Sequence, residues 1–470
     1  MIRFACLTPA ILLVVSAPPQ CEFAYGDELP AAARLLDDNI VMYLRPVPLT
    51  SPSGKYVAYV SRGFVCLADV ELGTTRKLVE VPGTWTHVFA GIDETRSGGG
   101  PDSIMRALGS FDKYKELQAK VTGEIGDFQW TVDSSAIVFG VHSYDVAQQA
   151  TRTHVWRVPL DGEPKVIASD ERSLTTRRGP GGKITRDGRF LVRHSGRERA
   201  LIWDIAKNAP RATPFLYLAP SPTSERWLGV EKDTRQLVVL DGEFNVIARH
   251  EEILPENEFG FDMKWSPDER FVFWRQQIGF DYYSNWTGCL YDLETRRRQI
   301  FTGDYMDENI EFTGNRGEFL RVGASGVQRA WSGLDMTEQY VGIVPDGRVH
   351  MQRFWDVRAD SSGTSSKDRL FSRVSNVTWS PDFHLFTIGL PRQEGRYGEV
   401  MHLADRERHL WKLPGNDSGQ YISPYNVAGF ALNGKLIIAY DDARLFALPV
   451  ATIQTSQNDI RQRNRLKPRP

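Results

Sequence analysis

The stretch Lys264–Trp274, KWSPDERFVFW, places a short polar segment between two apolar ones. Proline fixes φ near the value needed at the second position of a type I turn, so a turn is predicted around Pro267. After it, Phe271 and Phe273 alternate with their neighbours, which is the period of a β-strand. Because Trp274 breaks the alternation of polar and apolar residues, this strand is expected to be buried on both faces.

The same pattern recurs seven more times along the chain. Each copy has a bulky residue or strand end, then a polar turn, then an apolar strand. The other copies are Thr50–Ser61, Gln129–Val141, Lys183–Ser195, Ala219–Glu231, Glu311–Gly323, Thr378–Gly389 and Gly429–Tyr440. Their mean spacing is about 54 residues, slightly above the roughly 20–50 residues typical of solenoids, propellers and arrays, because some intervals carry insertions.

Six copies are followed by a second recognisable segment, which reads as a strand, a turn rich in Asp, Gly and charge, and another strand. These segments are Phe64–Glu80, Thr153–Ser169, Arg199–Ala212, Arg235–Arg249, Gly288–Gly303 and Glu399–Gly415. One unit is therefore a four-stranded meander, whose two faces are buried only when neighbouring sheets pack radially. The sequence predicts an all-β protein, a β-propeller of about eight four-stranded blades, with seven as the alternative.

The two ends of the chain are expected to meet in the last blade. Lys435–Val450 supplies a second and a third strand, and no fourth strand follows. Upstream of the first repeat, Asn39–Leu44 reads as an unassigned strand, and we expect it to complete the last blade. The propeller is then predicted to span residues 38–450, followed by a basic, disordered tail at residues 451–470.

The Trp-Ser-Pro-Asp turn at Trp265–Asp268, followed by Asp-Leu-Glu-Thr at Asp292–Thr295, resembles the repeats of TolB-like propellers. Such propellers also form the N-terminal domain of dipeptidyl peptidase IV-type enzymes. The resemblance covers about residues 38 to 450, so it implies the noncatalytic propeller only, and it implies a fold more than a role. The chain looks less like a WD40 array, since Trp203–Asp204 has no partnering Gly-His dipeptide.

The N-terminus has the features of a signal peptide. Arg3 precedes the apolar run Phe4–Ala17, which is too short to span a bilayer because spanning takes about 20 residues. Small residues at Ala24 and Gly26 suggest cleavage after residue 26, with an uncleaved anchor as the alternative. The mature chain would then be periplasmic or extracellular, without a transmembrane segment. Its two remaining cysteines, Cys66 and Cys289, are expected to be buried and unpaired. So few cysteines favour a bacterial envelope.

Two insertions interrupt the repeats. In the first, residues 102–121, one helical face is predicted from the spacing of Ile104, Ala107, Leu108, Phe111, Tyr114 and Leu117. This helix is expected either to pack on the rim of the ring or to act as a lid or docking element.

The second insertion, Gln276–Gly288, gathers aromatic and polar residues between two strands of the fifth unit. Aromatic side chains with polar neighbours are typical of loops that bind sugars and peptides. The candidate ligand-binding residues are Phe280, Asp281, Tyr282, Tyr283 and Trp286. The alternative is that these aromatics cover the edge of a blade.

The sequence contains few signs of catalysis. The chain contains no G-x-S-x-G, H-E-x-x-H or C-x-x-C motif. We therefore expect no cofactor, no metal and no catalytic residue. Three weaker alternatives remain: His142, His194 and His350 could converge on a metal in the central channel, His402 and His409 could share one, and Asp304–Asn309 could bind calcium.

These observations favour an exported, monomeric propeller scaffold that binds a protein, peptide or glycan partner in the envelope, without catalysis of its own. The net charge of −2 does not suggest a nucleic-acid partner. The alternative is a polysaccharide-active enzyme, a lyase or glycosidase, that uses the central channel.

Overall fold

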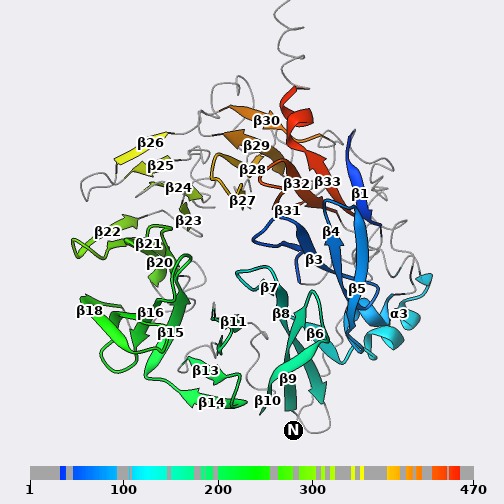
Figure 1. The fold of residues 1–470 in the computed structure, drawn as a ribbon, viewed down its shortest axis with the longest axis horizontal. Coiled ribbons are helices and arrows are strands. Elements are labelled where there is room, and N and C mark those ends of the chain that lie inside the picture. Colours follow the sequence, from blue (N-terminus) through cyan, green and yellow to red (C-terminus); the bar gives the residue numbers. More distant parts are fainter. Residues whose placement is uncertain are drawn as a thin grey trace, which may run out of the picture.

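The strands form a ring of sheets around a central axis in the computed structural model (Figure 1). The structure describes residues 32–38, 46–90, 92, 105, 108–126, 128–145, 150–173, 182–185, 187–193, 200–254, 263–278, 285–302, 309–312, 318–322, 340–343, 350–353, 378–391, 399–405, 409–414, 426–441 and 444–455. The described strands make seven sheets of four strands and one sheet of five. We number these sheets blades 1 to 8 in chain order.

The first four blades occupy the first half of the ring. Blade 1 contains β2 (Leu49–Thr50), β3 (Tyr56–Ser61), β4 (Phe64–Asp69) and β5 (Thr74–Glu80). Blade 2 contains β6 (Gly123–Ile125), β7 (Gln129–Trp130), β8 (Ala136–Asp145), β9 (Ala150–Pro159) and β10 (Lys165–Ser173). Blade 3 contains β11 (Gly182–Ile184), β12 (Phe190–Arg193), β13 (Leu201–Asp204) and β14 (Ala209–Ala212). Blade 4 contains β15 (Phe215–Pro220), β16 (Trp227–Glu231), β17 (Gln236–Leu240) and β18 (Val246–Ile253).

The other four blades complete the ring. Blade 5 contains β19 (Met263–Trp265), β20 (Phe271–Ile278), β21 (Asn285–Asp292) and β22 (Arg297–Thr302). Blade 6 contains β23 (Asn309–Phe312), β24 (Glu318–Val322), β25 (Tyr340–Ile343) and β26 (His350–Arg353). Blade 7 contains β27 (Thr378–Trp379), β28 (Leu385–Pro391), β29 (Glu399–Asp405) and β30 (Leu410–Lys412). Blade 8 contains β31 (Asn426–Ala431), β32 (Leu436–Tyr440), β33 (Leu445–Pro449) and β1 (Arg34–Asp37).

The predicted all-β propeller is therefore confirmed, with a few helices added. The predicted count of eight corresponds to the total number of sheets, and the alternative of seven to the number of four-stranded ones. All eight sequence repeats coincide with the first two strands of a blade. In the opening stretch, Trp265 ends β19 and Phe271–Trp274 begin β20, where Trp274 is fully buried.

The recurring polar turn is held by its own side chains. In blade 5, the backbone N–H of Phe271 donates to Ser266 Oγ at 2.9 Å, and Ser266 Oγ in turn donates to the Asp268 carboxylate. Blade 3 repeats this geometry, because Phe190 N–H donates to Thr185 Oγ1 at 3.0 Å. A Ser or Thr followed two residues later by Asp thus closes the turn locally, which explains why the pattern recurs with the blades.

The two faces of the ring differ in what they carry. The turns between first and second strands lie beside those between third and fourth strands, as shown by the hydrogen bond from Val70 N–H to Lys55 O at 2.9 Å. We call this side the turn face. The opposite side, the loop face, carries the connections between second and third strands and the connections between blades. Neighbouring blades are joined along the turn face, for example from Leu432 N–H to Gly54 O at 3.0 Å.

The bulky residue at the end of a first strand fastens its blade to the preceding one. Trp130 Nε1 donates to Leu49 O of blade 1 at 3.0 Å, and Trp265 Nε1 donates to Ala219 O of blade 4 at 3.2 Å. A buried indole N–H usually finds such a partner. In blades 2 and 5 the tryptophan of the repeat therefore supplies both apolar area and a directional contact between blades, whereas the buried Nε1 of Trp379, at the same place in blade 7, has no hydrogen-bond partner.

The N-terminal strand closes the ring, as predicted, but it is not the predicted segment. The closing strand is β1, which pairs antiparallel with β33, and Asp37 accepts a hydrogen bond from the buried Tyr59 hydroxyl at 2.7 Å. The choice of Asn39–Leu44 was wrong because an edge strand needs little apolar surface: in β1 only Leu36 is buried. Residues 39–45 lie outside the described residues.

The first insertion is also more broken than predicted. The connection between blades 1 and 2, which we call the helical insertion, contains α1 (Trp85–Val88) upstream of the predicted segment and α3 (Phe111–Gln118) within it, so residues 102–121 are not one helix. Gly109 has φ 65°, and Ser110, in extended backbone, accepts from Lys113 N–H, so α3 begins only at Phe111. Phe111 consequently leaves the predicted buried face and is 55% exposed, whereas Tyr114 is buried.

The C-terminal segment begins as a helix. Residues 450–455 are helical and Ile453 is 2% exposed against the last two blades, so the predicted disordered tail was wrong at its start. Two apolar residues three positions apart, Val450 and Ile453, suffice to hold one helical turn on the ring. Cys66 and Cys289 are buried and form no disulfide with each other, as predicted. Among the described helices, none is long and apolar enough to cross a membrane.

Candidate binding surface

Blade 2 rises above blade 1 on the loop face. Its central strands β8 and β9 contain ten residues each, whereas β3 and β4 of blade 1 contain six. Both β3 and β8 start directly after the polar turn, so the extra residues lie at the loop-face end. At about 3.3 Å per residue, four extra residues lengthen the blade by roughly 13 Å. We call this part, residues 141–145, 150–154 and 169–173, the raised wall.

The raised wall has its own buried contacts. β6 pairs with Val141–Ser143 of β8, which gives blade 2 its fifth strand. His142 is 5% exposed, and its Nδ1 lies 2.5 Å from Thr153 Oγ1 on β9. A Cβ at Gly123 would lie 2.8 Å from the His142 carbonyl oxygen, so only glycine allows β6 to approach this closely. The wall is thus a packed extension of the blade.

The helical insertion continues the wall over blade 1. Its two ends are tied together, since Thr122 N–H and Gly123 N–H both donate to Gly83 O, at 2.9 and 3.0 Å. Helix α1 rests directly on the turn between β3 and β4, where a Cβ at Gly63 would lie 2.7 Å from the His87 Cα. A closed loop fixed at both ends loses little further entropy when it binds a partner.

A small aromatic core stiffens the insertion. Trp85, Phe89 and Tyr114 are buried together, and the Trp85 and Phe89 ring centroids are 4.2 Å apart. Phe111 stacks on the outside of Tyr114 at 6.4 Å, with Lys115 Nζ 4.5 Å from the Phe111 ring centroid. An exposed aromatic ring held on a rigid support is the type of residue that dominates protein interfaces.

The predicted aromatic insertion falls between β20 and β21 of blade 5, whose connected ends lie on the loop face. The pairing of β20 with β21 runs without a break to Ile278 and Asn285, so the loop is shorter than the predicted Gln276–Gly288. Trp286 lies in β21 opposite Gln277. The other candidates, Phe280, Asp281, Tyr282 and Tyr283, lie outside the described residues.

The histidines proposed for a channel metal do not occupy equivalent positions. His142 is buried inside the raised wall, and His350 lies on β26, the outermost strand of blade 6 (Figure 1). A residue on an outermost strand is far from the central channel, so the proposed convergence with His350 was wrong. His194 lies outside the described residues, as do residues 304–308 of the proposed calcium loop.

His402 and His409, the second pair proposed to share a metal, lie in different surroundings. His402 lies on β29, while His409 Nδ1 contacts the Asp405 carboxylate at 2.8 Å in the following turn. Within the described part of the chain, no group of three or more His, Cys, Asp and Glu side chains is placed to hold a metal ion.

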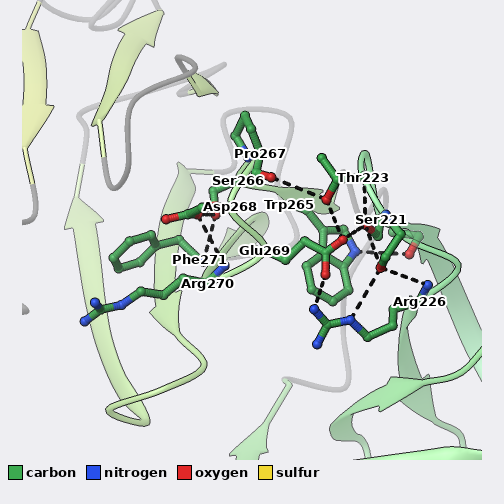
Figure 2. Close-up of polar contacts among 12 residues, drawn as sticks. Ser221, Thr223, Arg226, Trp265, Ser266, Pro267, Asp268, Glu269, Arg270 and Phe271 are labelled. Carbon is green, nitrogen blue, oxygen red and sulfur yellow. Dashed lines mark hydrogen bonds and ion pairs between the residues drawn. The ribbon is translucent and has the colours of Figure 1, made fainter.

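Sequence reasoning missed one charged cluster, which joins blades 4 and 5 on the turn face. Figure 2 shows Ser221, Thr223 and Arg226 of blade 4 converging on Glu269 of blade 5. Glu269 accepts from the Ser221 and Thr223 hydroxyls and pairs with the Arg226 guanidinium. Burial raises the pKa of Glu269, but hydrogen bonds from Ser221, Ser224 and Thr223 and the Arg226 charge outweigh it and lower the pKa to about 2.

This cluster, which we call the Glu269 clasp, holds two blades together by charge. Its sequence signal was weak but present. Glu269 has φ 58° at the turn position where Gly54, Gly188 and Gly434 stand in three other blades and where Ser134 and Phe383 stand in two more. A non-glycine residue in the left-handed region is costly, so Glu269 at this position is a weak signal of a specific role for its side chain.

Comparisons with known proteins give no identity for this chain. No protein-family model matches the sequence, and no curated protein matches it. Among solved structures, the Dos1 propeller shares 9% identity at a TM-score of 0.47, covering 89% of this chain and 95% of that one. A structure titled as that of the mitotic checkpoint complex shares 11% identity at a TM-score of 0.39, covering 96% and 98%.

A third structure, titled as that of the eukaryotic initiation factor, shares 12% identity at a TM-score of 0.42, covering 86% of this chain and 87% of that one. Identities and scores this low carry over no residue role. The propeller assignment therefore rests on the strand order and pairing described above.

Proposed function

We propose that the protein is a propeller scaffold, without catalysis of its own, that binds a protein, peptide or glycan partner on its loop face. The single observation that supports this most is the raised wall of blade 2, continued by the helical insertion over blade 1. Both are built to project from the ring, and both are tied by internal hydrogen bonds.

The contrast between the two faces supports the same choice. Turns on the turn face are short and close on their own Ser, Thr and Asp side chains, which leaves few groups for a partner. The loop face carries the wall, the exposed Phe111 ring and the blade 5 hairpin. Binding residues are concentrated on loops that a rigid scaffold positions.

We also propose that the scaffold is exported, as the N-terminal Arg3 and the apolar run Phe4–Ala17 suggest. The closing strand β1 begins at Arg34. Cleavage after residue 26 would therefore leave the closing strand intact. N-terminal sequencing of protein recovered from cells tests this point, because a start at residue 27 supports export and a start at Met1 rejects the cleaved form.

A photo-crosslinking experiment tests the binding face. A benzophenone amino acid is placed at Phe111 or Arg152 on the loop face, and at Leu72 or Val132 on the turn face, all of them exposed positions. We expect both loop-face positions to capture one product of the same mass, which mass spectrometry then identifies. Products from the turn-face positions alone would reject the proposed face.

A further inference from the structure

A buried histidine lies at the outer edge of the junction between blades 4 and 5. His250 belongs to β18, the outermost strand of blade 4, yet it is only 5% exposed. Histidines are usually intermediate in burial, and an outermost strand normally faces water on one side. The neighbouring blade must therefore cover this side chain.

The cover comes from Tyr291 on β21 of blade 5. The two rings meet edge to face, with centroids 5.5 Å apart and planes at 87°, and the Tyr291 hydroxyl lies 3.4 Å from His250 Nδ1. Tyr291 is 2% exposed and belongs to the apolar cluster that fills this junction. That cluster contains Leu228, Val230, Leu237, Val239 and Leu254 of blade 4 and Met263, Trp265, Val272, Trp274 and Cys289 of blade 5.

The surroundings favour a neutral imidazole. Burial lowers the pKa of His250, and the positive charge of Arg296, in the turn between β21 and β22, lowers it further. Glu252 of β18 is 2.5 Å from Arg298 of β22, so its charge is already matched. Glu251 and Asp292 are the remaining acidic groups that act on Tyr291, together with Glu252.

Two other described junctions are held by groups that do not titrate near neutral pH. Blades 1 and 2 are joined from Ser53 N–H to Ser134 Oγ, and blades 2 and 3 by the Gln129 amide with the Ile184 backbone. At the inner edge of the blade 4–5 junction, the Glu269 clasp stays ionised down to a pH of about 2. Among these three junctions, we therefore expect mild acid to act on the outer edge of the blade 4–5 junction, where His250 is buried.

We propose that the junction between blades 4 and 5 is a built-in acid switch: protonation of His250 opens its outer edge at Tyr291, while the Glu269 clasp holds its inner edge. A charge on the imidazole cannot be hydrated in the closed junction and is repelled by Arg296. Opening of β18 away from β21 exposes the imidazole to water. The ring as a whole stays closed.

The direction of the pH effect and its maximum size follow from the coupling between proton binding and closure of the junction. The closed junction binds fewer protons than the open one, so its closure is fully stabilised above the ordinary histidine pKa of about 6.5 and weakens as pH falls below that value. If the closed state never accepts the proton, the open fraction rises by up to roughly thirtyfold at pH 5.

Hydrogen exchange of the intact chain tests the proposal. Amide exchange in β18 and β22, corrected for the intrinsic effect of pH, is compared at pH 7.5 and pH 5.0 with exchange in β3 and β4 of blade 1. We expect opening of β18 and β22 to increase severalfold at pH 5.0, up to the limit above, with β3 and β4 unchanged. Equal changes in both blades, or none, would overturn the proposal without any variant.

Two variants assign the effect to His250. His250→Phe keeps a ring against Tyr291 but cannot be protonated, so it should abolish the selective response. His142→Asn removes a buried histidine from blade 2 and should leave the response in blade 5 intact. A response that survives His250→Phe, or that disappears in His142→Asn, would show that another group is responsible and would refute the assignment.

Discussion

Replacing Glu269 tests whether charge holds blades 4 and 5 together. In Glu269→Ala the Ser221 and Thr223 hydroxyls lose their acceptor, and Ser221 is only 5% exposed. Hydrogen bonds to a charged group contribute about 1.5–3 kcal/mol each, and a buried hydroxyl left without a partner costs about 1–3 kcal/mol. Because these terms overlap, we expect a loss of about 3 kcal/mol in the free energy of unfolding.

Two further variants separate charge from hydrogen bonding. Glu269→Gln keeps the shape and one acceptor, so a loss of about 1–2 kcal/mol is expected. Arg226→Ala removes a cation whose side chain is 46% exposed. Solvent screens such a pair, so about 0.5–1 kcal/mol is expected. Urea unfolding followed by tryptophan fluorescence gives all three values, provided that the denaturant slope is unchanged.

The relative sizes of the three losses in unfolding free energy show whether the hydrogen bonds or the ion pair contribute more. The pKa of Glu269 is lowered to about 2, so its contribution should be complete above pH 4.5 and be lost as pH falls through about 2. An Arg226→Ala loss equal to that of Glu269→Ala would show that the ion pair, and not the hydroxyl donors, dominates. Losses below about 0.5 kcal/mol in all three variants would show that the Glu269 clasp does not stabilise the ring.

Two other substitutions test the ring closure and the seat of the insertion. Tyr59→Phe removes the hydroxyl that donates to Asp37. We expect it to lower the free energy of unfolding in urea by about 1–2 kcal/mol and to expose the N-terminal strand to protease. Unchanged protease resistance would contradict closure of the ring through this contact. Gly63→Ala places a Cβ about 2.7 Å from the His87 Cα, at a residue whose φ is 80°. We expect this substitution to lower the melting temperature and to increase amide exchange in α1. Wild-type exchange in α1 would show that the helix does not rest on this turn.

The fold was predictable because blades 2, 3, 5 and 7 repeat one local rule and the other blades have related polar turns at the same place. A Ser or Thr that accepts from the backbone five residues later, together with an Asp two residues on, fixes the turn without distant partners. The apolar strand that follows is the second strand of the blade in every case. Local chemistry of this kind is readable from one copy, and repetition makes it reliable.

The closing strand was not predictable in the same way. Asn39–Leu44 is more apolar than Arg34–Asp37, yet the latter pairs with β33. The decisive contacts, Leu36 in the core of blades 1 and 8 and Asp37 with Tyr59, join residues far apart in the chain. No local pattern contains that information.

The candidate binding surface was visible in the sequence only in part. The sequence indicated a helix within residues 102–121, of which α3 is described, and it treated blade 2 as ordinary. The raised wall results from ten-residue strands whose extra residues pair with each other, with β6 and with β10. The acid-sensitive histidine was also missed, because the burial of His250 depends on Tyr291 of the next blade.

The most direct test of the proposed function is the affinity of the crosslinked partner, purified, for matched variants of the two faces. Calorimetry would compare the wild type with Phe111→Ala on the loop face and Leu72→Ser on the turn face, both at exposed positions. We expect Phe111→Ala to weaken binding by about tenfold or more, as for an aromatic anchor, and Leu72→Ser to leave the Kd unchanged. Weaker binding in Leu72→Ser with wild-type affinity in Phe111→Ala would contradict the proposal that this scaffold binds through its loop face.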